Sequence, residues 1–571
     1  MKKSKMMKLD KEERPWIYYY NNIPANLEYP DCSMVDKILD TAKKFPNNMA
    51  YSYYGTKITY KSFVQKIKKA ARALKSYGVM ENDKITICMP NTPEGIIMVY
   101  AVNMVGAICN MVHPMSSEKE LEYYINEANS KFIIVVDMMF DKIYKLKNNT
   151  CLEKIIVAKA SEEMRLAKSF FYWLFKARKI KVPKYDNSVL CWDEFILHGK
   201  SFDGIYHVKK KAYDPAVILY SGGTTGKPKG IVLANLNFNA LALMATNVIK
   251  EAKEGATILS ILPIFHGFGL GVCIHTPLCV GMGCILIPTF HYKKFGNIIR
   301  KNKPNFIVGV PTLYEGLLQS NIGNNDLKSV TAVICGGDNL NKTLKDKLNN
   351  FLYEHGSNAK VRVGYGLTEA TGAVCLSPEN INNDKIIGVP FPDMYMKIVI
   401  PATHEKQEIG KDGEICVSGP LVMMKYLNDD VETNQVLRIH EDGRLWLHTG
   451  DIGYMGKDNL FYFSQRLKRI IVSSGYNIYP TYIEEIINTH YAVLTSTVIG
   501  IPHPYKGQVV KACIVLKNDF KESLKIENEI RELVEKHVAK YALPVKYEFR
   551  KTLPTTLVGK VAFKELEKEE K

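Results

Sequence analysis

The sequence predicts an α/β protein with a large N-terminal domain of mixed, largely parallel sheets and a small α+β C-terminal domain. Short β-branched runs alternate with longer helical patterns, and each helical pattern follows its run after a turn. The clearest runs are Lys84–Cys88, Lys131–Val136, Phe306–Val310 and Ala332–Cys335. Pro311 directly follows the third run, where it suits the first turn of a helix.

The pattern changes near residue 400. Gly413–Gly419 and Asn459–Phe463 resemble strands bounded by tight turns, which predicts a small β-rich region over about 388–464. We expect this region to complete an N-terminal domain of residues 1–466. The remaining residues, 467–571, have the size of a separate domain and are predicted to form the α+β part of the chain.

Composition narrows the class of partner. The 571 residues carry a formal net charge of +17, which suits nucleic acid, an anionic membrane surface or a small polyanionic substrate. Lys and Arg are spread along the chain without interleaved aromatic residues, so we do not expect nucleic-acid binding. The 12 cysteines form no CxxC pair and most lie among apolar residues, which indicates reduced thiols and a cytoplasmic protein.

Two segments bear on export and membrane insertion. Residues 1–16 are basic but lack the apolar stretch of a secretion signal. Residues 255–290 contain no Asp, Glu, Lys or Arg, yet Pro263, Pro277 and Pro288 divide them into short pieces. We therefore expect buried strands and a loop there rather than a membrane-spanning helix.

The stretch Tyr220-Ser-Gly-Gly-Thr-Thr-Gly-Lys-Pro-Lys-Gly230 has the composition of a phosphate-binding loop. It is not a Walker loop, since the first glycine of that pattern falls on Ser221 and the magnesium-binding hydroxyl on Pro228. The β-rich sequence on both sides predicts a hairpin instead. Its backbone N–H groups, its hydroxyls and the charge of Lys229 can still surround phosphate oxygens.

This loop resembles the signature loop of the adenylate-forming superfamily, which contains acyl-CoA synthetases, firefly luciferases and peptide-synthetase adenylation domains. Four further segments are similar to motifs of that family and occur in the family's order: Gly364–Glu369, Thr449–Asp451, Arg466–Pro480 and Leu553–Lys560. Together the motifs span most of the chain. The resemblance implies an enzyme that joins a carboxylate to the α-phosphate of ATP, releases pyrophosphate and transfers the acyl group to a thiol.

The resemblance assigns residues to the phosphates and the metal ion. The β- and γ-phosphates would lie against the loop, and Mg²⁺ against a carboxylate and a loop hydroxyl, since this ion prefers oxygen ligands. The residues implied are Ser221, Gly222, Gly223, Thr224, Thr225, Gly226 and Lys229 for phosphate, and Glu369 and Thr224 for Mg²⁺ and catalysis.

The nucleoside would lie on the remaining N-terminal motifs. One tyrosine would stack on adenine, a Gly-Gly-Asp segment would line the adenine edge, and an aspartate would accept hydrogen bonds from the ribose hydroxyls. The residues implied are Tyr365, Gly366 and Thr368 near the adenine face, Gly337 and Asp338 at its edge, and Asp451 and Arg466 at the ribose.

The resemblance also implies that the C-terminal domain is mobile and rotates about Lys468 between the two half-reactions. Lys560 would reach the carboxylate and the α-phosphate in the first. Gly475 and Tyr476 would approach the path of CoA in the second. The chain departs from the family pattern at Lys468, where relatives often carry Asp, and at Phe563, where many carry a basic residue that contacts CoA.

The acyl pocket is implied by a segment around His266, which is similar to the family's pocket-lining segment Pro263–Gly269. Amino-acid adenylating domains usually hold the substrate amine with an Asp, whereas residues 306–317 contain only Glu315 as an acid. Small or apolar residues leave room for an aliphatic chain: Gly271, Gly281, Gly283 and Val374.

We therefore expect a ligase that uses ATP, Mg²⁺ and CoA to activate a medium- to long-chain fatty acid. Three alternatives stay open: an aryl or short-chain acyl-CoA ligase, a fatty-acyl-AMP ligase that loads an acyl carrier protein, and a non-catalytic adenylate-binding protein. Residues 165–181 have apolar side chains on one helical face and basic ones mostly on the other. This pattern suits peripheral contact with the inner membrane surface, or a helix packed on the N-terminal domain.

Overall fold

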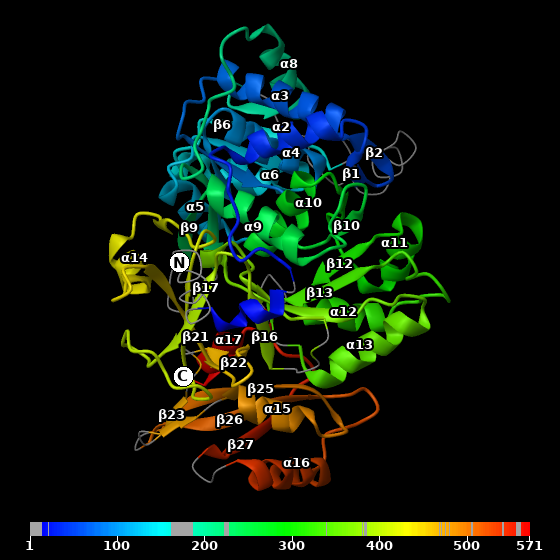
Figure 1. The fold of residues 1–571 in the computed structure, drawn as a ribbon, viewed down its shortest axis with the longest axis vertical. Coiled ribbons are helices and arrows are strands. Elements are labelled where there is room, and N and C mark those ends of the chain that lie inside the picture. The colour runs from blue at the N-terminus through cyan, green and yellow to red at the C-terminus, as the bar shows by residue number, and fades with distance from the viewer. Residues whose placement is uncertain are drawn as a thin grey trace, which may run out of the picture. The chain divides into compact units, whose positions relative to one another are not determined.

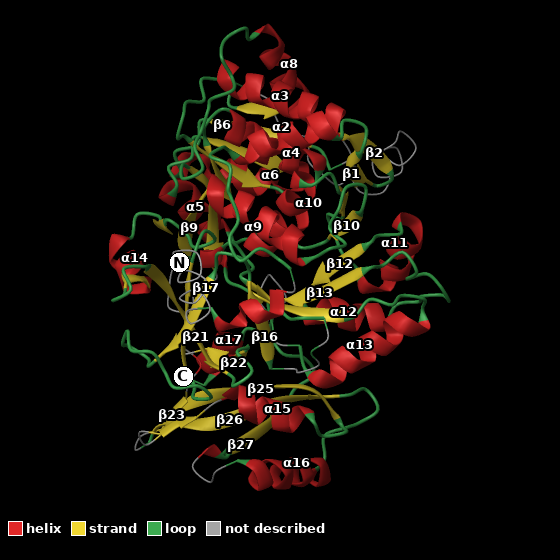
Figure 2. Cartoon of the chain, viewed as in Figure 1, coloured by secondary structure: helices red, strands yellow, loops and turns green. Residues whose placement is uncertain are grey.

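The computed structural model describes residues 14–20, 22–160, 187–221, 228–338, 340–379, 381, 385–466, 469, 471–473, 476–478, 480–503, 506–538, 542–555 and 561–570. The chain divides into two compact units, one of residues 1–396 and 417–447 and the other of residues 397–416 and 448–571. Figure 1 traces the chain, and Figure 2 shows its mixture of helices and strands. The predicted α/β class, with a large N-terminal and a small C-terminal part, is confirmed.

The first sheet of the larger unit has the order β19-β9-β8-β4-β3-β5-β6-β7. Its central strands are parallel, with β3 between β4 and β5, whereas β8 and β9 form an antiparallel hairpin. The strands are β3 (Lys84–Cys88), β4 (Ile108–Met111), β5 (Phe132–Val136), β6 (Lys154–Ala158), β7 (Val189–Cys191), β8 (Pro215–Ser221), β9 (Lys229–Ala234) and β19 (Lys425–Tyr426).

The second sheet of this unit runs β16-β15-β14-β13-β12-β10-β11-β1-β2. The strands from β14 to β11, and β1 beside β11, are parallel. The strands are β1 (Met49–Tyr53), β2 (Thr56–Thr59), β10 (Thr257–Ser260), β11 (Gly283–Leu286), β12 (Phe306–Gly309), β13 (Ala332–Gly336), β14 (Val361–Tyr365), β15 (Cys375–Leu376) and β16 (Ile386–Pro390). The strands predicted near 306 and 332 are therefore confirmed as β12 and β13.

Helices buried on all sides lie between the two sheets. All residues of α4 (Pro93–Met104) are buried, as are most of α9 (Asn235–Val248), and a helix that is apolar all round belongs in an interior. Helices α4 and α9 contact strands of the first sheet, while the helical segments at 268–279 contact β10 and β11 of the second.

The other helices of this unit are shorter or amphipathic. Helix α12 begins at Pro311, as the sequence predicts. The helices are η1 (Pro15–Tyr20), α2 (Met34–Lys44), α3 (Tyr60–Ser76), α5 (Glu118–Glu127), α6 (Phe140–Leu146), α8 (Trp192–His198), α11 (Phe295–Asn302), α12 (Pro311–Leu318), α13 (Lys342–Glu354) and α14 (Asp430–Val436), with single 3₁₀ turns η2 (Asp137–Met139), η3 (Lys147–Asn149), η5 (Gly199–Ser201), η7 (Tyr292–Lys294) and η8 (Thr368–Ala370).

The charge-free segment 255–290 differs from its prediction in one respect. It contains the buried strands β10 and β11, but between them lies a π-helix, η6 (Phe268–His275), followed by α10 (Thr276–Cys279). A β-carbon on Gly269 would stand 1.9 Å from the carbonyl oxygen of Pro263, so only glycine fits where this helix begins. Among the described residues, no helix is both long enough and apolar enough to cross a membrane.

The β-rich segment and the C-terminal unit follow. Strands β17 (Tyr395–Val399), β18 (Gly413–Ser418), β21 (Leu445–Met455) and β22 (Phe461–Arg466) are neighbours in that order, with β20 (Leu437–Ile439) paired to β21. The final sheet has the order β24-β23-β26-β25, with β27 beside β26. Its elements are β23 (Ile471–Ser473), β24 (Tyr476–Ile478), α15 (Pro480–Asn488), β25 (Val493–His503), β26 (Gly507–Leu516), α16 (Leu524–His537), β27 (Lys546–Phe549) and α17 (Phe563–Glu569).

Helices cover both faces of this final sheet. Side chains alternate along a strand, so Val498 packs with the core beneath α15 and α16 while Ile499 packs with Leu566 of α17. Lys511, buried in β26, pairs with Glu548 of β27 and with Glu570, which follows α17. The C-terminal helix is thereby tied to the sheet by a buried ion-pair network.

Candidate active site

The predicted phosphate loop joins two strands, and its hairpin geometry is confirmed. Ser221 at the end of β8 pairs with Lys229 at the start of β9, and Tyr220 pairs with Gly230. The backbone of Ser221 belongs to β8, whereas the predicted Gly222, Gly223, Thr224, Thr225 and Gly226 lie outside the described residues.

Lys229 is held by two side chains from a distant part of the chain. Its Nζ lies 2.5 Å from Oε2 of Glu432 and 5.0 Å from the centre of the Tyr426 ring. Tyr426 is placed there because β19 pairs with β9, setting Tyr426 opposite Ile231. The predicted phosphate lysine therefore has an anionic partner on α14 and an aromatic one on β19.

Glu369 lies in the 3₁₀ turn η8 and belongs to the same group. The Tyr426 hydroxyl donates to Oε1 of Glu369 over 3.0 Å, and the Met423 amide donates to the Glu369 carbonyl over 2.8 Å. Burial, and then the Glu369 carboxylate, raise the pKa of Tyr426 well above its usual range, so the phenol stays protonated as the donor. Tyr426 thus connects the loop lysine to the predicted metal carboxylate.

The predicted adenine residues meet at the ends of two parallel strands. In the paired strands β13 and β14, Gly336 stands opposite Gly364, which brings Gly337 and Tyr365 to one edge of the sheet. Ligands of α/β sheets bind at the carboxyl ends of parallel strands. Gly337 has a φ of +80°, a conformation that favours glycine. Asp338 follows it and is exposed.

Two other predicted residues of this region are constrained by packing. A β-carbon on Gly366 would stand 2.5 Å from the carbonyl oxygen of Gly372 and from Cα of Ala373, so the close backbone approach alone requires glycine. Thr368 is buried at the start of η8. Both residues therefore shape the turn that carries Glu369.

The two predicted ribose residues are neighbours in the smaller unit. Asp451 of β21 pairs directly with Arg466 of β22 in an antiparallel ladder. Asp451 is buried, and its amide donates to the Thr449 hydroxyl over 3.1 Å, while that hydroxyl donates to the Ile415 carbonyl over 2.7 Å. The Thr-Gly-Asp turn is therefore fixed against β18.

Glu414 completes the support of this turn. One of its oxygens accepts from the Gly450 amide at 3.0 Å, and the other accepts from Nδ1 of His448 at 2.8 Å. Glu414, Cys416 and His448 place metal-ligand atoms within 4.8 Å of one another. Because both Glu414 oxygens already accept hydrogen bonds, the group satisfies itself and orients the strand that carries Asp451.

The remaining C-terminal predictions are only partly located. Lys468, Gly475 and Lys560 lie outside the described residues, and Tyr476 is described only as backbone of β24. Thr555 and Val561, which are described on either side of Lys560, form an antiparallel bridge.

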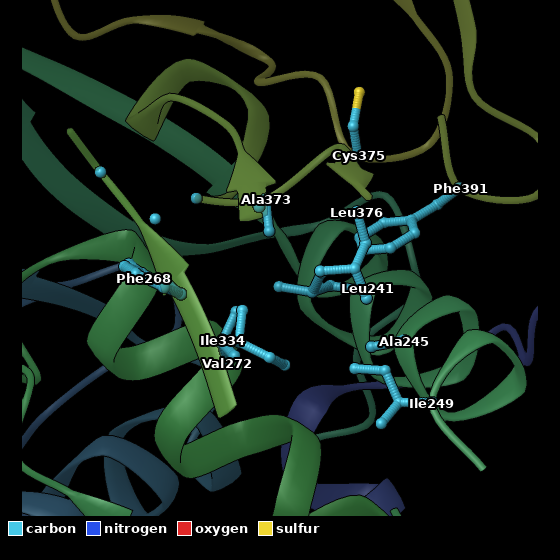
Figure 3. A pocket seen from close by; sticks show the side chains of 14 residues that line it. Leu241, Ala245, Ile249, Phe268, Val272, Ile334, Ala373, Cys375, Leu376 and Phe391 are labelled. Carbon is cyan, nitrogen blue, oxygen red and sulfur yellow. The ribbon is translucent and has the colours of Figure 1, made fainter. Parts of the chain in front are cut away.

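An apolar cavity of about 30 Å³ lies beside the adenine edge (Figure 3). It is bounded by α9, η6 and the strands β13 to β15, and its wall includes Gly336 and Gly337. Other lining residues are Leu241, Ala245, Ile249, Phe268, Val272, Ile334, Gly364, Gly372, Ala373, Cys375, Leu376 and Phe391. Such a wall suits an aliphatic or aromatic group attached to a carboxylate that reacts near the nucleotide.

Several predictions about this wall are wrong. A β-carbon on Gly281 would meet Phe45 and Glu254, and one on Gly283 would meet Met49, so neither glycine faces the cavity. The lining includes Ala373 and Cys375 but not Val374, which lies between them. Gly271 shapes the cavity wall only indirectly. A β-carbon added to it would lie 2.8 Å from Leu241, so the absence of a side chain leaves space for that leucine.

His266 lies near the start of the cavity wall rather than in it. Its Nδ1 accepts a hydrogen bond from the Phe268 amide over 3.3 Å, which orients the first turn of η6. Phe268 lines the cavity, whereas His266 is not part of the described lining. One residue of the predicted pocket segment therefore lines the cavity, while the acyl-binding role of the segment and the catalytic role of His266 stay predictions.

Sequence reasoning missed Tyr426, Glu432 and Glu414. The sequence gives a weak indication of Glu432. Asp429 caps α14 and Glu432 follows three residues later, a helix-start pattern that fixes the position of the Glu432 carboxylate. The local sequence around Tyr426 does not indicate that it pairs with Glu369, and the sequence around Glu432 does not indicate that it pairs with Lys229.

Residues 38–427 match the family described as AMP-binding enzyme, and residues 482–560 match its C-terminal domain. The chain is 34% identical over 567 residues to a long-chain-fatty-acid–CoA ligase of Bacillus subtilis, covering 98% of both proteins. A ligase of the same description from Haemophilus influenzae is 28% identical, over 97% of this chain and 98% of that protein. The fold is similar to that of ATP-bound MatB from Rhodopseudomonas palustris, with a TM-score of 0.80 at 22% identity over 95% of this chain and 99% of that one.

Proposed function

Because this chain belongs to the AMP-binding enzyme family, we propose that it activates a medium- to long-chain fatty acid with ATP and transfers the acyl group to CoA. It is an AMP-forming acid–thiol ligase. The observation that carries an apolar acid is the cavity beside Gly336 and Gly337, whose wall suits an aliphatic or an aromatic group. The name of the Bacillus subtilis relative, a long-chain-fatty-acid–CoA ligase, supports the aliphatic choice.

In the first half-reaction a carboxylate oxygen attacks the α-phosphorus of ATP, the bond between the α- and β-phosphates breaks, and acyl-AMP, a mixed anhydride, forms as pyrophosphate leaves. Both reactants are anions, so the site must align them and offset their charge. We assign Lys229 and the 221–226 loop to the β- and γ-phosphates, Tyr365 and Gly337 to adenine, and Lys560 to the oxygens that react.

The chemistry of Glu369 fits a magnesium ion. A carboxylate is a preferred ligand of this hard cation, and one Glu369 oxygen is already oriented by the Tyr426 hydroxyl. When bound, the ion would neutralise phosphate charge, with Thr224 as the second protein ligand.

In the second half-reaction the thiol of CoA loses its proton and attacks the acyl carbon, and AMP leaves. We assign Gly475 and Tyr476 to the path of CoA, and Asp451 and Arg466 to the ribose. The domain boundary after residue 466 and the rotation about Lys468 belong to the same proposal.

Pyrophosphate release with a panel of acids tests the proposal. We expect palmitate and octanoate to give a higher kcat/KM than acetate, benzoate or 4-coumarate, and CoA to accept the product. A preference for benzoate or 4-coumarate would select the aryl ligase instead. Adenylate formation without transfer to CoA, but with transfer to an acyl carrier protein, would select the carrier-loading ligase.

Enlarging Ala245 should shorten the preferred acid. This residue of α9 lines the cavity, so Ala245→Leu is expected to lower kcat/KM for palmitate by at least roughly tenfold while octanoate changes much less. The ratio of the two kcat/KM values measures the effect. Leu241→Ala, which widens the same wall, should move that ratio in the other direction; an equal loss for every acid would contradict a cavity that measures chain length.

Peripheral membrane contact through residues 165–181, which lie outside the described residues, is a separate part of the proposal, as is a cytoplasmic location at the inner membrane surface. We expect the protein to float with anionic phosphatidylglycerol vesicles, because basic and apolar side chains lie on opposite faces of the predicted helix. Phe170→Ser with Trp173→Ser should abolish flotation. Unchanged flotation of this double variant, or none for the wild type, would favour a helix packed on the N-terminal domain.

A further inference from the structure

The ion pair between Lys229 and Glu432 joins the phosphate loop to helix α14. The two charged atoms lie 2.5 Å apart, and the side chains are 19% and 34% exposed, so water screens the pair only in part. Asp429 accepts a hydrogen bond from the Glu432 amide at 2.9 Å, which fixes the start of α14 and the carboxylate with it. Glu432 is therefore held in place as a partner for this lysine.

Two further carboxylates lie near the pair. Asp429 accepts a hydrogen bond from the Glu432 amide, and Glu369 accepts one from the hydroxyl of the buried Tyr426 beside Lys229. Within the described residues, Lys229 therefore contacts one carboxylate directly and is connected through Tyr426 to a second before any metal or phosphate binds. A metal-free polyphosphate entering this region meets carboxylates at close range, whereas a polyphosphate that carries a divalent cation meets them with much of its charge neutralised.

We propose that Glu432 is a counter-ion that competes with the polyphosphate of ATP for Lys229, and that this competition makes ATP binding depend on a divalent cation. The inference rests on the proposed assignment of Lys229 to the phosphates. A metal-free polyphosphate must draw the lysine away from Glu432 and approach that carboxylate. Removing the charge of Glu432 eliminates both the competition for Lys229 and the repulsion between Glu432 and the phosphates. The gain in affinity should be larger for metal-free ATP than for the metal complex, whose charge is already partly neutralised.

The test compares dissociation constants by calorimetry, without fatty acid so that no turnover occurs. Glu432→Gln keeps the size of the side chain and removes its charge. We expect it to tighten binding of ATP in EDTA by roughly fivefold, and binding of ATP with excess Mg²⁺ by no more than about twofold. AMP, which has no β- and γ-phosphates, should bind as it does to the wild type.

Asp430→Asn is the matched control. Asp430 lies on the same helix, is 83% exposed at its side chain and contacts Lys425 at 3.9 Å, so this variant removes an equal charge without touching Lys229. It should leave the ratio of the two ATP constants unchanged. Glu432→Ala, a second neutral variant, should shift the ratio in the same direction as Glu432→Gln, which separates the charge effect from a local packing change.

A double-mutant cycle with Lys229→Gln isolates the pair. In that background Glu432→Gln should no longer change the ratio. A ratio in the single Glu432→Gln variant within twofold of wild type, or weaker binding of metal-free ATP, would overturn the proposal and identify Glu432 as a residue that positions Lys229. If Lys229→Gln itself leaves ATP binding unchanged, the assignment of Lys229 to the phosphates fails instead.

Discussion

Replacing Lys560 with alanine is expected to slow acyl-adenylate formation by roughly 100-fold or more, the scale of a removed electrostatic stabiliser in a catalytic site. The reason is that this lysine is assigned to the oxygens on which charge builds during the first half-reaction only. The backbone bridge between Thr555 and Val561, on either side of it, does not use the Lys560 side chain, so we expect the variant to fold. Pyrophosphate release in single-turnover experiments measures this step.

The second half-reaction provides the internal control for Lys560→Ala. Given preformed acyl-adenylate and CoA, the variant should form acyl-CoA at close to the wild-type rate. Lys568→Ala, at an exposed position of α17, should affect neither step. Equal loss of both half-reactions would contradict a domain that rotates between them, and no loss of either would make Lys560 an ordinary surface charge.

Replacing Glu369 with glutamine should lower kcat/KM for ATP by about 100-fold, because a neutral amide is a much weaker ligand for Mg²⁺ at a step that develops phosphate charge. A graded series follows from the structure. Tyr426→Phe keeps the carboxylate but removes the hydroxyl that orients it, so we expect a smaller loss of a few-fold.

The magnesium dependence of pyrophosphate release distinguishes these variants from general damage. Both should need more Mg²⁺ for half-maximal rate, Glu369→Gln more so than Tyr426→Phe. Glu354→Gln, at an exposed position of α13, removes the same charge from the same unit and should behave as wild type. A Glu369→Gln variant that loses activity without any change in its magnesium requirement would argue against metal binding by this residue.

Local patterns predicted the framework because they reflect local physics. Pro311 at the start of α12 and the hairpin around the phosphate loop follow from backbone preferences that a few residues determine. The π-helix at 268–275 was missed, since an apolar run with glycines and prolines does not separate a strand from a tightly packed helix. Gly281 was misplaced for a similar reason: its φ of +83° explains the glycine without any ligand.

The missed parts of the site depend on distant pairing. Lys229 and Glu432 are separated by 203 positions, and Tyr426 and Glu369 by 57. Each pair exists because β19 adds to the edge of the first sheet beside β9, an arrangement that no pattern within one segment encodes. Motif resemblance supplied one partner of each pair, and only the folded chain supplied the other.

The narrowness of the cavity has a consequence for how an acid is selected. At about 30 Å³ it is far smaller than the roughly 300–1,000 Å³ of sites that enclose drug-sized molecules, so it has no room for an acyl chain as it stands. On the proposed function, an acyl chain that enters here would therefore have to displace side chains of the wall rather than fill empty space. If only a fraction of molecules has the wall open, the apparent dissociation constant would be the intrinsic one divided by that fraction, so the free energy of opening the wall would join chain length in determining which acids are used.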